Sequence, residues 1–244
     1  MAILSIDTAG NFCAAALSDT VTGNLLSAVS YDVGRGHAEI LIRVIDEALL
    51  QADLEYQDID KIVTTLGPGS FTGVRVGIAT ARAIALGLSK PVVGVSVLQA
   101  CAQHAIQIDK TRFQQRVVSV ILDARREQYY FQPFRHGKPL QEARVCNIGE
   151  LMNFHQDFKK QEVVLCGSGA VQFLQHGSGV KPVADFPIAH HLAAAPIEAV
   201  AELGKHACVS KTRPEPIYLR GADAKQQQGF AITRAESEDV TAVS

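Results

Sequence analysis

The feature that most constrains the fold of this chain is an order of secondary-structure elements that occurs twice. From residue 2 we expect an apolar strand that ends at Asp7, followed by two more strands and an amphipathic helix. The same order is expected again from residue 117, where the first strand ends at Asp123. The two copies share little sequence, so the repeat is one of topology. It predicts a duplicated α/β fold with a cleft between two lobes, and it places both aspartates at strand ends that face this cleft.

Hydrophobic periodicity gives the expected elements. In the first copy it predicts strands over 2–6, 12–18, 25–31, 59–66 and 91–95, and helices over 36–52, 72–88 and 96–106. In the second copy it predicts strands over 117–122, 128–134, 140–146 and 163–166, and helices over 147–158, 170–175 and 190–209. The lobes are expected over 1–107 and 108–220, with the 190–209 helix able to pack back on the first lobe. The polar residues 221–244 are expected to form a mobile tail.

Composition excludes several classes of protein. Hydrophobic residues make up 47% of the 244-residue chain and charged residues 20%, so a core can form without disulfides. A net charge of −2 argues against binding nucleic acid through the charge of this chain alone. Five scattered cysteines without a CxxC pair indicate reduced cytosolic thiols. No signal peptide is expected, and the longest apolar run, 78–88, is too short to cross a bilayer.

A turn rich in glycine lies between the 59–66 strand and the helix that follows. The segment Gly67-Pro68-Gly69-Ser70-Phe71-Thr72-Gly73 places backbone N–H groups at a helix start, where an anion can bind. It lacks the lysine of a Walker A loop and the glycine spacing of a nucleophile elbow. A turn that begins a buried helix is the favoured interpretation, and a nucleotide or phosphate site is the alternative. The residues of that alternative site are Asp7, Thr8, Gly69, Ser70 and Asp123.

Small residues recur at every fourth position of the 72–88 helix. Such a face lets two helices approach closely. Burial within its own domain and contact with another subunit both agree with this pattern. In the second case the interface includes the 36–52 helix, and a leucine at Gly77 is predicted to prevent association while the fold stays intact. The predicted interface residues are His37, Leu41, Ile45, Gly73, Val74, Gly77, Ile78, Ala81 and Ala85.

No catalytic residue and no metal ligand is assigned. The eight histidines include no pair at the spacing of a helical metal site, and His37-Ala38-Glu39 lacks the Pro-Cys-x-x-Cys of zinc deaminases. Nothing in the sequence marks a nucleophile. Asp7 and Asp123 are candidates to orient a hydrated Mg²⁺ or a phosphate, and the alternative is a turn aspartate that binds local amides.

Six segments, in this order, resemble the bacterial TsaB (YeaZ) family. They are 3–8, 36–39, 66–77, 91–96, 122–126 and 216–220, so the resemblance extends over about residues 1–220. It implies an actin-like fold of the sugar-kinase and Hsp70 ATPase type, built from two ribonuclease H-like lobes.

The resemblance also implies a function. Members of the family are non-catalytic subunits of the bacterial complex that makes N6-threonylcarbamoyladenosine at position 37 of tRNAs. They pair with the paralogue TsaD through the first two helices of the N-terminal lobe, and form homodimers through the same surface. ATP and a metal are expected on TsaD, and a TsaE-type ATPase is expected to join the complex. A chain of this family is expected to meet tRNA only through the complex. It is expected in the cytoplasm, without contact to a membrane. The alternatives are an ATP-dependent phosphotransferase of this fold and a glycoprotease-like (M22) peptidase.

Overall fold

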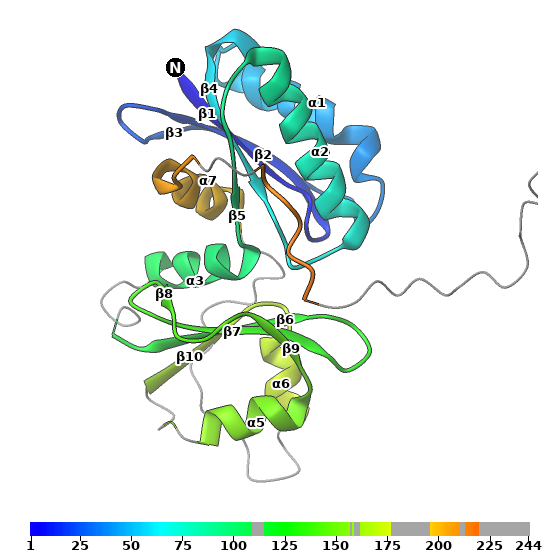
Figure 1. The fold of residues 1–244 in the computed structure, drawn as a ribbon, viewed down its shortest axis with the longest axis vertical. Coiled ribbons are helices and arrows are strands. Elements are labelled where there is room, and N and C mark those ends of the chain that lie inside the picture. The colour runs from blue at the N-terminus through cyan, green and yellow to red at the C-terminus, as the bar shows by residue number, and fades with distance from the viewer. Residues whose placement is uncertain (109–114, 157, 159–161, 177–195, 210–212, 220–244) are drawn as a thin grey trace, which may run out of the picture.

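The computed structural model describes residues 1–108, 115–156, 158, 162–176, 196–209 and 213–219. These residues form two α/β lobes, one above the other in Figure 1. The predicted tail over 221–244 and the first part of the predicted 190–209 helix lie outside the described residues.

The first lobe is built on a five-stranded sheet in the order β3-β2-β1-β4-β5. Its strands are β1 (Ala2–Asp7), β2 (Phe12–Asp19), β3 (Leu25–Asp32), β4 (Ile59–Thr65) and β5 (Val92–Val95). The first three form an antiparallel meander, whereas β4 and β5 run parallel to β1. Parallel strands need crossover connections, which α1 (His37–Gln51) and α2 (Phe71–Leu88) supply. This is the arrangement of a ribonuclease H-like lobe.

The second lobe repeats the beginning of the first. Its strands are β6 (Val117–Asp123), β7 (Tyr129–Arg135), β8 (Lys138–Pro139), β9 (Arg144–Cys146) and β10 (Val163–Cys166). They form the order β10-β6-β7-β8, with β9 also paired to β7. The predicted 140–146 strand is therefore only partly right, because residues 140–143 belong to neither β8 nor β9, although the N–H of Leu140 still donates to the carbonyl oxygen of Pro133 at 2.9 Å. Gln132 Nε2 instead donates to the backbone oxygen of Gln141, at 3.0 Å.

Helices cover both sheets and separate them (Figure 1). One face of the first sheet packs against α1 and α2, and the outer face of the second sheet packs against α5 (Ile148–Gln156) and α6 (Ala170–His176). Between the sheets lie α3 (Val97–Ile108) and α7 (Ile197–His206), in a core that both lobes share. Because helices cover both of its faces, the first sheet buries all six residues of β1.

The small residues of α2 face the first sheet. A Cβ atom at Gly73 would overlap the carbonyl oxygen of Thr8, and one at Gly77 would overlap Thr8 Oγ1. The four-residue spacing therefore brings α2 close to β1 within the same chain. This contradicts the expectation that a leucine at Gly77 leaves the fold intact, because no space exists for its side chain.

Candidate functional site

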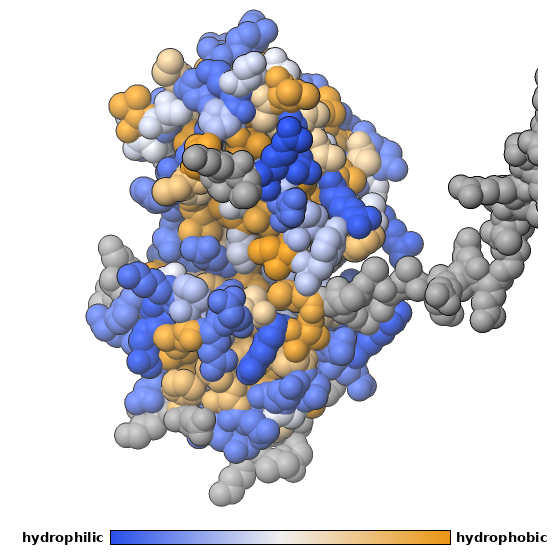
Figure 2. All heavy atoms as spheres, in the orientation of Figure 1, coloured by the Kyte–Doolittle hydropathy of each residue, from blue (hydrophilic) through white to orange (hydrophobic). Residues whose placement is uncertain are grey.

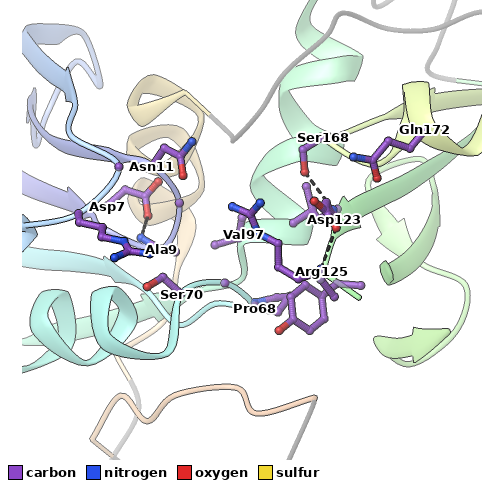
Figure 3. Close-up of a pocket in the computed structure, with 17 residues that line it drawn as sticks. Asp7, Ala9, Asn11, Pro68, Ser70, Val97, Asp123, Arg125, Ser168 and Gln172 are labelled. Atoms are coloured by element: carbon purple, nitrogen blue, oxygen red, sulfur yellow. Dashed lines mark hydrogen bonds between the residues drawn. The ribbon is translucent and has the colours of Figure 1, made fainter. Parts of the chain in front are cut away.

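A pocket of about 520 Å³ lies between the two lobes (Figure 3). Its lining includes Asp7, Gly69, Ser70 and Asp123, so the structure brings together four of the five residues predicted for a phosphate site. The fifth, Thr8, is buried outside the pocket, and its hydroxyl donates to the carbonyl oxygen of Gly73 at 2.7 Å. The repeated order of elements thus predicts a real cleft with an aspartate on each side.

Asp7 is held within the first lobe. Its Oδ1 accepts hydrogen bonds from the backbone N–H of Ala9 at 3.0 Å and from Thr65 Oγ1 at 2.7 Å. Burial raises the pKa of the Asp7 carboxyl, and these two hydrogen bonds act in the opposite direction. One oxygen of this carboxylate is therefore already occupied in shaping the turn after β1.

Asp123 has a similar local role in the second lobe. Its Oδ1 accepts from the backbone N–H of Arg125 at 2.7 Å, and its own N–H donates to Ser168 Oγ at 3.0 Å. Three consecutive residues after it, 125–127, have positive φ, which bends the β6–β7 connection sharply. This bend directs the Arg125 side chain into the pocket (Figure 3). Arg125 belongs to the 122–126 segment of the family resemblance, but its place in the pocket depends on the backbone geometry of this bend.

The glycine turn packs on the turn that follows β1. The N–H of Ser70 donates to the carbonyl oxygen of Ala9 at 2.7 Å, and Ser70 Oγ accepts from the N–H of Gly73 at 3.2 Å. A Cβ at Gly69 would overlap the same Ala9 oxygen, so glycine is required for this close approach. Backbone groups that could bind a phosphate are thus used within the chain, which favours a turn that begins a buried helix.

The nine residues predicted for a partner interface are all buried in this chain. The apolar and small residues that were predicted to contact a partner face the first sheet of this chain instead. His37, for example, places Nε2 3.0 Å from the carbonyl oxygen of Gly10. Any contact that α1 and α2 make with a partner must therefore use other residues of the same helices.

The exposed side of α1 and α2 carries apolar residues among charged ones. Ile42 and Leu50 on α1 are 51% and 80% exposed, and Leu86 on α2 is 83% exposed. The exposed positions of α2 also include Ala79 and Ala83. We call these five residues the helix face, and Figure 2 shows apolar side chains among charged ones on this part of the first lobe. Within the described chain, α2 is also the one helix long and apolar enough to cross a membrane, a criterion that core helices meet as well.

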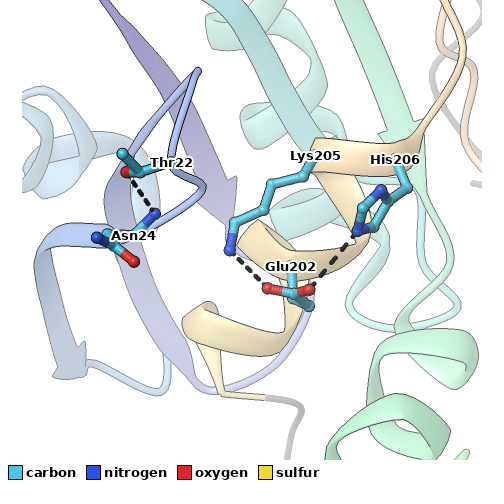
Figure 4. Close-up of polar contacts among 5 residues, drawn as sticks. All are labelled: Thr22, Asn24, Glu202, Lys205 and His206. Atoms are coloured by element: carbon cyan, nitrogen blue, oxygen red, sulfur yellow. Dashed lines mark hydrogen bonds and ion pairs between the residues drawn. The ribbon is translucent and has the colours of Figure 1, made fainter.

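A polar group on α7 lies near the turn between β2 and β3 (Figure 4). Glu202 forms an ion pair with Lys205, and its Oε1 lies 3.7 Å from His206 Nε2. Lys61 Nζ donates to the backbone oxygen of Lys205 at 3.2 Å. In the turn, the N–H of Asn24 donates to Thr22 Oγ1 at 3.2 Å. Of these contacts, the one from Lys61 joins α7 to the first sheet. The part of the chain that the structure describes contains no group of three or more histidine, cysteine or acidic residues placed to hold a metal.

A family model described as TsaD, tRNA N6-adenosine threonylcarbamoyltransferase, matches residues 29–241. The chain belongs to this family. A curated relative named tRNA threonylcarbamoyladenosine biosynthesis protein TsaB, from Haemophilus influenzae, is 28% identical over 232 residues, which are 90% of this chain and 94% of that protein. The Escherichia coli protein of the same name is 35% identical over 135 residues, 55% of each protein. These matches confirm the predicted TsaB (YeaZ) membership.

The fold of this TsaB-family chain is shared with a solved structure described as YeaZ from Pseudomonas aeruginosa. The TM-score is 0.69 at 23% identity, and the match covers 89% of this chain and 99% of the other. Together with the two sheets, this likeness confirms the predicted duplicated α/β fold.

Proposed function

We propose that this chain is a non-catalytic subunit in the synthesis of threonylcarbamoyladenosine in tRNA. In this proposal it pairs with a threonylcarbamoyltransferase paralogue of the TsaD type through the helix face. The names of its relatives and of its family support a part in the synthesis of threonylcarbamoyladenosine in tRNA. The observation that supports the mode of action is the exposed apolar side of α1 and α2.

The helix face has the properties of an interface core. Fully burying a leucine or isoleucine contributes about 1.5–3 kcal/mol, so the exposed parts of its three large side chains contribute about 3–6 kcal/mol toward the cost of association. Ala79 and Ala83 are four residues apart on the exposed side of α2, so another helix can approach there closely. Arg43 and Asp46 are exposed on α1 and provide polar residues of the kind that surround interface cores.

The transfer chemistry belongs, in this proposal, to the paralogue. ATP and a metal bind there, a TsaE-type ATPase joins the same complex, and tRNA meets this chain only through the complex in the cytoplasm. The polar groups of Asp7 and of the glycine turn support a structural role for them, since their partners lie within the chain. Without the paralogue, the helix face pairs two copies of this chain.

Titration of the TsaD-type paralogue from the same genome into this chain tests the proposal. The variant is Leu86→Asp, and the matched control is Val21→Asp, since Val21 is 88% exposed in the β2–β3 turn. We expect the first variant to weaken the pairing at least a hundredfold, because a carboxylate would be buried, and the second to leave it unchanged. Val21→Asp should melt at the wild-type temperature and Leu86→Asp a few degrees lower, because an aspartate in the last turn of α2 is a poorer helix former and faces the negative end of the helix dipole. Equal affinities for the two variants would contradict the proposal.

A second candidate is an ATP-dependent phosphotransferase, which the presence of Asp7 and Asp123 in one pocket favours. Titration of ATP into the isolated chain, with and without Mg²⁺, decides between the two. Tight Mg²⁺-dependent binding with turnover would replace the accessory function by the enzymatic one.

A further inference from the structure

Three side chains form a stacked cluster where α2 begins. The guanidinium carbon of Arg75 lies 3.7 Å from the ring centroid of Phe71, and Arg75 Nε donates to the hydroxyl of Tyr218 at 2.8 Å. The two aromatic rings are 5.5 Å apart. Phe71 and Tyr218 nevertheless remain 46% and 51% exposed. We call these three residues the arginine cluster.

The backbone around Tyr218 is fixed on both sides. The N–H of Ile217 donates to the carbonyl oxygen of Leu66 at 2.8 Å, and Leu219 packs against the core that both lobes share. Tyr218 therefore reaches α2 from a segment that is attached to the end of β4. This attachment holds Arg75 in one orientation, and a preformed orientation lowers the entropy lost on binding.

The arginine cluster presents hydrogen-bond donors to the solvent, and it contains no negatively charged acceptor. A guanidinium has five N–H groups, of which Tyr218 accepts one. Within the described residues Arg75 forms no ion pair, and its stacking on Phe71 leaves the edge of the guanidinium available. The Tyr218 hydroxyl accepts from Arg75 and keeps its own hydrogen to donate. Such a set of donors matches the two oxygens of a carboxylate.

We propose that the arginine cluster is a preformed anchor for an aspartate or glutamate of the protein that covers the helix face. The inference rests on the proposed function, because Phe71 and Arg75 belong to the same helix as Ala79, Ala83 and Leu86. Arginine and tyrosine are enriched among the residues that dominate interface energies. The charges favour a protein over tRNA: the chain has a net charge of −2, and α1 exposes Glu39 and Asp46 beside Arg43, so no basic patch for a polyanion surrounds Arg75 among the described residues.

The test measures the affinity of this chain for the TsaD-type paralogue at low and high salt. The variants are Arg75→Gln and Tyr218→Phe, alone and combined. Arg144→Gln is the matched control, since the Arg144 guanidinium lies over the Phe131 ring in the second lobe at 5.5 Å. We expect Arg75→Gln to weaken the pairing about thirtyfold and to flatten its salt dependence. Tyr218→Phe should weaken it less, and the double variant should lose less than the two single effects combined, because Tyr218 both positions Arg75 and donates its own hydrogen to the same carboxylate.

The outcomes separate this inference from the proposed function. If Leu86→Asp abolishes pairing while Arg75→Gln and Arg144→Gln both leave it unchanged, the anchor is wrong and the pairing stands. If Leu86→Asp also has no effect, the helix face is not the interface, and the anchor fails with it. If Arg75→Gln lowers only the affinity of the complex for tRNA, the occupant is nucleic acid and the inference is overturned. Arg75→Lys, which keeps the charge and loses the paired donors, replaces Arg75→Gln if that variant melts early.

Discussion

Two glycines of α2 provide a test of how the helix packs. Gly77 and Gly87 belong to the same helix, but a Cβ at Gly77 would overlap Thr8 Oγ1, whereas a Cβ at Gly87 would meet no atom within 4 Å. Thr8 Oγ1 cannot move freely, because it is buried and donates to the carbonyl oxygen of Gly73 at 2.7 Å. We therefore predict that alanine has opposite effects at the two positions.

The magnitudes follow from three contributions. Replacing glycine by alanine inside a helix gains about 1 kcal/mol, and this gain applies to both positions. At Gly77 the added methyl overpacks the contact with β1 by about 1–3 kcal/mol. Moving Thr8 away also weakens a buried hydrogen bond, at about 1 kcal/mol. The free energy of unfolding should therefore fall by about 1–3 kcal/mol for Gly77→Ala and rise by about 0.5–1 kcal/mol for Gly87→Ala.

Urea unfolding of the isolated chain, followed by far-ultraviolet circular dichroism, measures both effects. The midpoint should move to lower urea for Gly77→Ala and to higher urea for Gly87→Ala, with unchanged slopes. If both midpoints rise, α2 does not pack against β1 as described, and the explanation of its small residues is refuted.

Two further predictions concern buried polar groups. Burial lowers the pKa of His155 to about 4. The folded chain therefore keeps this imidazole neutral, whereas the unfolded chain takes up a proton below a pH of about 6.5. The free energy of unfolding should fall by up to about 3 kcal/mol as the pH drops from about 6.5 to about 4. Urea midpoints at several pH values should show this dependence in the wild type and a weaker one in His155→Gln, and identical pH profiles would contradict the assignment. Asp7→Ala should lower the free energy of unfolding by about 1–3 kcal/mol, because Thr65 Oγ1 and the Ala9 N–H lose their acceptor. The affinity of this variant for the TsaD-type paralogue should stay unchanged in titration, and a loss of pairing with the fold intact would show that the pocket takes part.

Local patterns predicted the strands other than 140–146, and the strand-end positions of both pocket aspartates, correctly. Asp7 and Asp123 each end an apolar run, so their place at a strand end follows from a few neighbouring residues. The predicted 140–146 strand was less accurate, because whether residues 140–143 join the ladder depends on the path of β7 beside them.

The surface of α2 could not be predicted in the same way. Glycine and alanine at every fourth position permit close approach to a sheet or to another subunit, and the sequence does not distinguish the two. Only the packing of α2 on β1 shows that Gly73 and Gly77 face inward while Ala79 and Ala83 face outward. The arginine cluster could not be predicted from the sequence either, because Arg75 and Tyr218 are 143 residues apart in the chain.

The central claim is that the outer side of α1 and α2 pairs with a TsaD-type paralogue. Amide hydrogen exchange of this chain, alone and with an excess of that paralogue, tests it most directly. Exchange should slow in α1 and α2 on mixing and stay unchanged in α5 and α6. Unchanged exchange in α1 and α2, or protection only around the pocket between the lobes, would contradict it.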